Sequence, residues 1–351
     1  IFLGTEAITG STVTVNLLNS LPGVNPPQSR LESVQVIWVG GTFGAELVLG
    51  IPTNINGQAN TQIRYGAQIY LAPGSSITTA GTLQYTGLLA DGGGTFLDSG
   101  ATINGAGVSH VGWLGIDNTD ATFNGKLTLA AVTGNAVVAA SRIELSGGGK
   151  INVGKSDALV LHPTEFPTDT DPIPAQTLAD IKPLIIAGYA GGTWNPADGV
   201  DAIYGSDIVG QNPKRGIGYT VATAAGNFLG EPVAVGDILI RNTLLGDANL
   251  DGTVNFTDLL ALAQSYNLTG KNWNQGDFNY SANGLVNFDD LLPTAQNYNV
   301  SLLADGSLSG EGMGFTPEFQ AEWAFALASV PEPTTLAALA GVGLLALRRR
   351  K

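Results

Sequence analysis

The chain has 351 residues and a formal net charge of −14, and only 13% of its residues are charged. Its 15 lysines and arginines are too few to build a phosphate-neutralising face, which excludes nucleic acid as a partner. Because the chain has no cysteine, disulfides and thiolate metal sites are excluded, and its 48 glycines indicate a turn-rich β protein. The chain begins at Ile1 without an export signal, so we interpret it as a fragment or a processed chain.

Residues 1–161 are expected to form many short strands, because β-branched runs alternate with Gly, Asn, Asp and Ser. A weak repeat aligns residues 71–81 with 97–107, and its apolar positions are Ile77, Ile103, Phe123 and Ile151. This pattern predicts a mainly β chain with a solenoid resembling a right-handed β-helix, in which each coil buries one apolar row. A β-sandwich, which has strands every 8–12 residues or so, is the alternative.

Residues 162–245 are predicted to form a small α+β connector. Four prolines between 163 and 174 exclude a strand or helix interior. After them, Thr177 is expected to cap a helix over 178–187, with Asp180 in its first turn and Gly188 as its stop. A strand is expected over 233–242.

Residues 246–300 contain the same acidic motif twice. Its first copy follows the spacing of an EF-hand loop, in which alternate side chains point toward a calcium ion and a glycine at position 6 allows the turn. The predicted Ca²⁺ ligands are Asp247, Asn249, Asp251, the carbonyl of Thr253 and Asp258, with Gly252 as the turn glycine. An Asx-rich turn without a metal is the alternative.

The second loop runs from Asp277 to Asp290 and is two residues longer. With Gly284 as the turn glycine, Ser281 and Ala282 are interpreted as the insertion. The predicted ligands are Asp277, Asn279, Asn283, the carbonyl of Leu285 and Asp290. One carboxylate fewer predicts weaker calcium binding than in the first loop.

The twin loop resembles a dockerin type I domain, which consists of two loop–helix units. That resemblance implies a cohesin-like protein partner, recognised at loop positions 10 and 11. Here these positions are Phe256-Thr257 and Phe288-Asp289 instead of small hydroxyl pairs, and Pro293 interrupts the second exit helix. We therefore expect the module to serve folding and spacing more than cohesin binding. The whole arrangement looks like that of large surface proteins of planctomycete-type bacteria.

Residues 301–329 are predicted to form a linker and a short helix capped by Thr316, with Pro317 at its first position. Residues 330–351 contain Pro331-Glu332-Pro333, an apolar run expected to be helical, and a basic end. This tail resembles the PEP-CTERM sorting signal. The resemblance implies export, transient tethering to the inner membrane, processing by an exosortase-type enzyme, and a location at the cell surface or outside the cell.

The sequence offers little sign of catalysis. Its two histidines, His110 and His162, lie in unremarkable settings, and no catalytic site is predicted. We expect a structural or adhesive protein, with extracellular polysaccharide as a possible ligand. The alternatives are a β-helix lyase or glycosidase that uses carboxylates such as Asp98, Asp117 and Asp120, or a component that docks to a cohesin-bearing scaffold.

Overall fold

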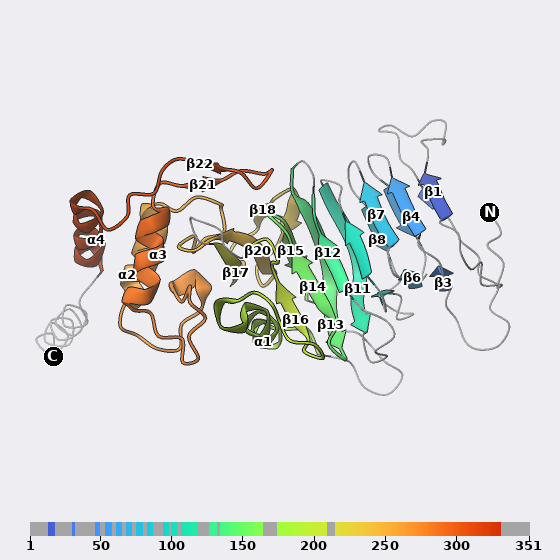
Figure 1. The fold of residues 1–351 in the computed structure, drawn as a ribbon, viewed down its shortest axis with the longest axis horizontal. Coiled ribbons are helices and arrows are strands. Elements are labelled where there is room, and N and C mark those ends of the chain that lie inside the picture. The colour runs from blue at the N-terminus through green and yellow to red at the C-terminus, as the bar shows by residue number, and fades with distance from the viewer. Residues whose placement is uncertain are drawn as a thin grey trace, which may run out of the picture.

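The computed structural model describes residues 126–131, 134–163, 174–208 and 215–330, and the strands β1 to β11 within residues 13–117. The strands lie side by side along the long axis of the molecule, as Figure 1 shows. Three helices gather beyond the strands toward the C-terminus: α2 (Phe256–Ser265), α3 (Phe288–Asn297) and α4 (Pro317–Ser329). The described chain therefore passes from a strand region to a helical end.

The first sheet has seven strands, and all its neighbouring strands are parallel. Side chains alternate along β12, where Leu127 and Leu129 are buried and Lys126 and Thr128 are partly exposed. In spatial order the strands are β1 (Val13–Leu17), β4 (Thr53–Gly57), β7 (Ser75–Thr79), β10 (Gly100–Ile103), β12 (Lys126–Leu129), β14 (Lys150–Val153) and β16 (Ala202–Tyr204).

The second sheet has eleven strands and mixes parallel with antiparallel pairs. Strand β20 (Ile238–Leu244) pairs antiparallel with β17 (Arg215–Val221) on one side and with β15 (Ala158–Leu161) on the other. The other strands pair in parallel and are β13 (Ala136–Ser146), β11 (Gly107–Asp117), β9 (Gly94–Leu97), β8 (Leu83–Thr86), β6 (Gln68–Leu71), β5 (Thr61–Arg64), β3 (Glu46–Leu49) and β2 (Arg30–Leu31).

The expected mainly β solenoid is wrong. The described residues form a mixed α/β structure with four α-helices, and their sheets are not wound into a solenoid or closed into a barrel. The β-sandwich alternative also fails, because sandwiches are built from antiparallel sheets. The repeat did predict one register correctly, since Ile77 pairs with Ile103. However, Ile103 then pairs with Leu129, whereas Ile151 pairs with Leu127, so the predicted apolar row is not continuous. Phe123 lies outside the described residues.

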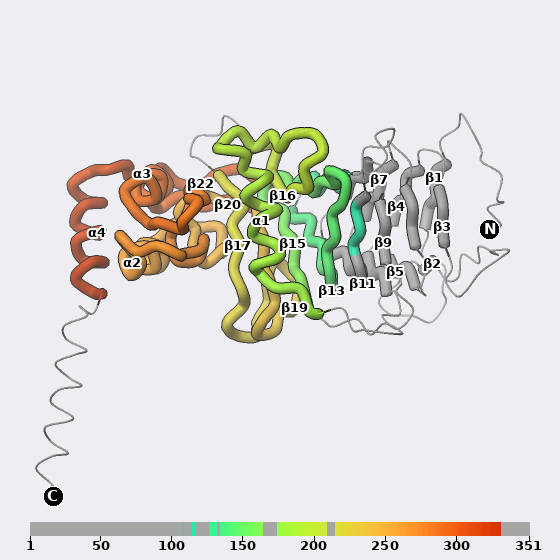
Figure 2. Tube along the Cα trace, turned by 90° about the horizontal axis from the view of Figure 1, so that it is seen from below, coloured from blue at the N-terminus to red at the C-terminus, as the bar shows by residue number. Residues whose placement is uncertain are grey.

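Helix α1 (Leu178–Tyr189) confirms the predicted cap but not the predicted end. Thr177 and Asp180 form a capping box, in which the Thr177 backbone N–H donates to Asp180 Oδ2 at 2.8 Å. Gly188 lies inside the helix, where an added Cβ would be 1.9 Å from the Ile203 carbonyl oxygen of β16. Close packing on the sheet therefore requires this glycine, and Figure 2 shows α1 lying across the strands.

The predicted strand over 233–242 is two strands. The strand β19 (Glu231–Val233) pairs with β18 (Gly226–Phe228) in a hairpin, and β20 starts only at Ile238. Gly236 has φ +100° between them, a conformation that glycine adopts readily. The segment therefore turns at Val235-Gly236, closed by the hydrogen bond from Asp237 N to the Ala234 carbonyl, before it enters the sheet.

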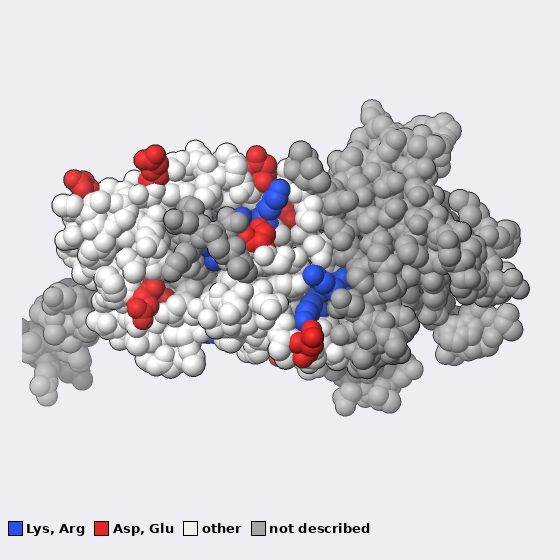
Figure 3. All heavy atoms as spheres, in the orientation of Figure 1, with Lys and Arg blue, Asp and Glu red and all other residues white. Residues whose placement is uncertain are grey.

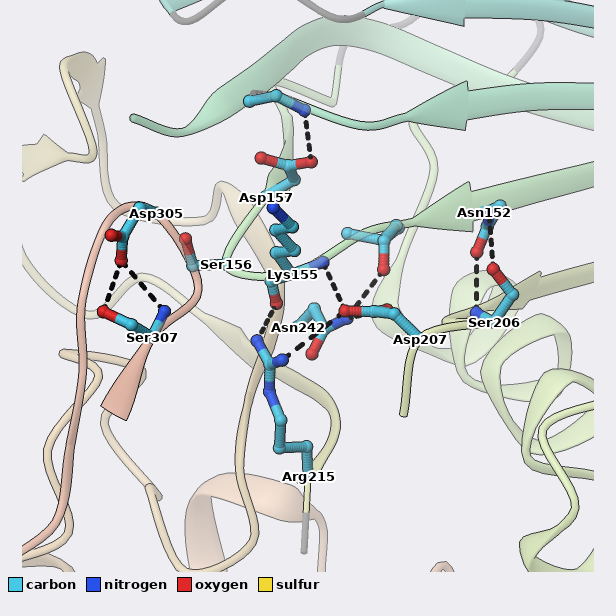
Figure 4. A network of polar contacts seen from close by, with 12 residues as sticks. Asn152, Lys155, Ser156, Asp157, Ser206, Asp207, Arg215, Asn242, Asp305 and Ser307 are labelled. Carbon is cyan, nitrogen blue, oxygen red and sulfur yellow. Dashed lines mark hydrogen bonds and ion pairs between the residues drawn. The ribbon is translucent and has the colours of Figure 1, made fainter. Parts of the chain in front are cut away.

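A polar network joins the strands to the connector and to the C-terminal hairpin (Figure 4). Asp207 accepts from Lys155 N at 2.7 Å and from Asn242 Nδ2 at 2.9 Å, and Arg215 Nη1 lies 3.4 Å from Asp207 Oδ2. Ser156 Oγ donates at 2.8 Å to the carbonyl of Ala304, which lies between β21 (Ser301–Leu302) and β22 (Leu308–Ser309). These contacts fix the hairpin against the strand region.

Candidate functional site: the twin acidic loops

The last residue of each loop closes the loop onto its exit helix. Asp258 Oδ1 accepts from the backbone N–H groups of Ala248 (2.9 Å) and Asn249 (3.3 Å), at the start of loop one. Its Oδ2 accepts from Asn255 N at 2.9 Å, which completes the N-terminal cap of α2. One buried carboxylate therefore holds both ends of loop one.

Loop two repeats this arrangement. Asp290 Oδ1 accepts from Phe278 N (2.9 Å) and Asn279 N (3.1 Å), and its Oδ2 accepts from Asn287 N (2.9 Å) at the start of α3. The predicted sequence repeat is therefore also a repeat of backbone contacts.

The first residue of each loop buries a carboxylate oxygen without a hydrogen-bond partner in the described structure. Asp247 Oδ2 accepts from Gly252 N at 2.9 Å and from the Thr243 hydroxyl, and its Oδ1 has no partner. Asp277 Oδ1 accepts from Ser281 N at 2.9 Å, and its Oδ2 has none. Both aspartates are fully buried, and a buried oxygen of this kind is costly unless a cation or donor meets it.

The polar residues in the middle of loop one are largely exposed and form hydrogen bonds with one another. Asn249 Nδ2 donates to Asp251 Oδ2 and Asp251 N to Asn249 Oδ1, both at 2.9 Å. Thr253 N donates to Asp251 Oδ1 at 2.8 Å, and the Thr253 hydroxyl contacts Ser301. Asn249 and Asp251 thus contact each other and make no hydrogen bond to Asp247.

Loop two brings an unpredicted residue to its centre. The Ser281 hydroxyl donates to Asp277 Oδ1 (3.1 Å) and accepts from Leu285 N (2.7 Å). Asn283 is exposed, and its side chain contacts Leu285 N at 3.3 Å. Counting straight from Asp277 without an insertion would have found Ser281 at position 5. The side-chain oxygen of Asn279, a predicted ligand, is buried and has no partner in the described structure.

Burial dominates the electrostatics of both loops. Desolvation raises the pKa of Asp247 to about 7 and the pKa values of Asp258 and Asp290 to about 6, and it also raises the pKa of Asp277. In the described part of the chain no three His, Cys, Asp or Glu side chains could hold a metal by themselves. A cation in these loops would also need amide and carbonyl oxygens, which calcium accepts.

Aromatic side chains connect the two loops to each other and to the sheet. Trp273 is fully buried, and its indole N–H donates to the Asp247 carbonyl at 2.7 Å. Tyr280, in loop two, donates its hydroxyl to the Ile217 carbonyl of β17 at 3.0 Å and accepts from Ile217 N at 2.8 Å. Trp273 and Tyr280 lie 5.5 Å apart between ring centres. The loops therefore share one packed core.

The phenylalanines at loop position 10 contact aromatic side chains of the C-terminal segment, although Phe288 stays 47% exposed. The Phe256 ring lies 5.4 Å from Phe325 of α4, and Phe288 lies 5.6 Å from Phe315, just before α4. Phe319 of α4 is fully buried and lies 5.3 Å from Tyr298. In Figure 2, α4 lies beside α2 and α3 at the end of the described chain.

Of the residues considered for catalysis, the structure describes the side-chain surroundings of His162. Its Nδ1 lies 2.8 Å from Asp237 Oδ2 and its Nε2 lies 3.1 Å from Glu231 Oε1. Both ring nitrogens are thus engaged by carboxylates, an arrangement that favours a structural ion pair. Asp98 and Asp120 lie outside the described residues, and His110 and Asp117 lie in β11, whose backbone alone is described there.

The His162 cluster predicts a pH-dependent stability. The hydrogen bond to Glu231 is the main cause that raises the pKa of His162, against the opposing effect of burial. Its stabilisation is fully present below the unfolded pKa of about 6.5 and is lost as pH rises through the higher folded pKa. Between pH 6 and 9, the free energy of unfolding should fall more steeply in the wild type than in H162Q. Urea unfolding at several pH values measures this, and E144Q, which changes a carboxylate in a partly exposed ion pair, should keep the wild-type slope.

The part of the surface that the structure describes shows no basic face on the side drawn in Figure 3. On the side drawn in Figure 3, the described surface is mostly uncharged, and basic groups lie near acidic ones. In the described part of the chain, no helix has both the length and the apolar character to cross a membrane.

The comparisons with known proteins bear on the tail. Residues 329–351 match the PEP-CTERM protein-sorting motif. No curated protein and no solved structure matched the chain. The match confirms the predicted sorting signal and indicates C-terminal processing by an exosortase. The chain is thus an exported, cell-surface protein with a PEP-CTERM sorting motif at its C-terminus.

Proposed function

We propose that the twin loops bind two calcium ions and that this dockerin-like module is a structural link between the strand region and the sorting tail of a surface protein. The main support is the pair of buried, unpartnered oxygens, Asp247 Oδ1 and Asp277 Oδ2, at the same position of both loops. Calcium is the cation that fits, because the remaining donors are carboxylate, amide and carbonyl oxygens.

The ligands divide between the two loops. Loop one would use Asp247, Asn249, Asp251, the Thr253 carbonyl and Asp258. Loop two would use Asp277, Asn279, the Leu285 carbonyl and Asp290, with Asn283 or Ser281 at its fifth position. Bound calcium supplies positive charge to carboxylates that burial otherwise destabilises, and it ties each loop to its exit helix.

A structural role fits the position of α4 better than docking to a cohesin-like protein. Phe256 and Phe288, at the recognition positions implied by the dockerin resemblance, pack against Phe325 and Phe315 of the same chain. Phe325 of α4 therefore occupies part of the surface that a cohesin-like partner would contact at Phe256. We assign the adhesive part of the role, the binding of extracellular polysaccharide, to the strand region.

Calcium titration by calorimetry tests the proposal. We expect two sites in the wild type and one in each of D247N and D277N, because each change removes the charge of a buried first ligand. D289N is the matched control, since Asp289 is exposed beside loop two and should leave both sites intact. Absence of calcium binding in the wild type would exclude the calcium role.

The enzymatic alternative needs its own test. Acidic polysaccharides would be incubated with the wild type and with a D98N/D117N variant, and reducing ends would be measured. Release of reducing sugar by the wild type and its loss in the variant would replace the structural role with a catalytic one.

A further inference from the structure

A buried arginine side chain of the second sheet packs against loop one. Arg241 lies in β20 and is only 3% exposed. Its Nη1 donates to the Leu250 carbonyl, inside loop one, at 2.7 Å. Both of its terminal nitrogens lie 3.0 Å from where a Cβ on Gly252 would be. The guanidinium therefore packs directly beneath the turn of the loop.

The charge of Arg241 acts on the loop carboxylates. Burial lowers the pKa of Arg241, whereas the charges of Asp247 and Asp251 raise it. Arg241 in turn lowers the pKa of Asp247, although burial dominates there. Its Nε has no hydrogen-bond partner in the described structure, so the side chain is held chiefly by Leu250 and by this electrostatic attraction.

Loop two has a different neighbour at its turn. An added Cβ on Gly284 would be 2.6 Å from the backbone N and O of Lys271, not beside a guanidinium. The nearby cation is Lys182, whose Nζ donates to Asn272 Oδ1 at 2.8 Å and to the Lys271 carbonyl at 3.3 Å. Lys182 is partly exposed and therefore more strongly screened by water than Arg241.

We propose that Arg241 is an internal counter-ion of loop one, which stabilises the loop without calcium and lowers its affinity for calcium. The inference rests on the proposed calcium role. Loop one has three predicted carboxylate ligands and loop two has two, so a unit positive charge beneath loop one offsets its extra carboxylate ligand. The two loops should therefore differ less in affinity than their ligand counts predict.

The test uses the full chain with D277N, so that only loop one can bind calcium. Adding R241Q keeps a side-chain N–H donor near Leu250 but removes the charge. We expect the calcium dissociation constant to fall on the order of tenfold. We also expect a lower unfolding temperature without calcium, so that the rise on adding calcium is larger than in D277N alone.

Two further variants separate charge from packing. R241K, which keeps the charge, should bind calcium within about threefold of the D277N parent. K182Q changes the screened cation near loop two and should alter loop one much less than R241Q does. If R241Q folds only when calcium is added, the counter-ion role is also supported, because the uncompensated carboxylates then need the metal.

Two results would overturn the inference. If the D277N parent binds calcium and R241Q binds it equally or more weakly, Arg241 is a packing residue and the calcium role survives. If the D277N parent binds no calcium while the wild type does, loop one is not a site and the inference fails with that half of the proposed function.

Discussion

Chelation of calcium is expected to lower the free energy of unfolding of the twin-loop module by about 4 kcal/mol for each site filled at a thousand times its dissociation constant. The effect should be large because each loop buries a first carboxylate with one unpartnered oxygen, which the proposed calcium ion would meet. Thermal unfolding of the purified protein, followed by tryptophan fluorescence with calcium or with EGTA, measures the shift.

The double variant D247N/D277N is the control for this experiment. Its unfolding temperature should be the same with calcium and with EGTA, because both first ligands have lost their charge. Magnesium should stabilise the wild type less than calcium does, since it requires a tighter octahedral shell. An equal response of wild type and double variant to EGTA would contradict the prediction.

The second large effect is expected at the contact between α4 and the loop helices. Phe319 is fully buried against Tyr298 and Phe315, so F319A leaves a cavity and should cost about 3–5 kcal/mol. Because α4 is a single helix at the end of the fold, that loss should detach α4 rather than unfold the whole molecule. Hydrogen exchange over 317–329 should become fast in F319A.

F325A is the matched control, because Phe325 lies in the same helix but is 61% exposed. Its exchange over α4 should stay close to that of the wild type. Slow exchange over α4 in F319A would show that other contacts hold the helix, among them the backbone bond from Gly314 N to the Ala295 carbonyl.

Local signals in the sequence predicted local structure well. Thr177 with Asp180 marked the start of α1, and Thr316 with Pro317 marked the start of α4, because a cap depends on neighbouring residues alone. The loop spacing likewise identified the Asp258 and Asp290 carboxylates, which close both loops. Their function as calcium ligands stays a prediction.

What the sequence missed depends on contacts between distant segments. Arg241 precedes loop one and gives no motif, and only the packing of β20 beneath Gly252 places its charge there. Ser281 is missed when Gly284 sets the register of loop two, whereas a direct count from Asp277 places it at position 5. The fold class failed for a related reason: a repeat of apolar residues can predict which strands pair, as with Ile77 and Ile103, but not whether the sheets close into coils.

The position of β20 has a mechanical consequence. This strand runs directly into loop one and is paired on both sides, with β15 and β17. A pull on the C-terminal end enters the described chain through α4 and can reach the strand region by two routes: through the twin loops to β20, or through the hairpin β21–β22, which Ser156 holds to the strand region. The loops and the hairpin therefore share the load, and the rigidity of the loops sets their part of it.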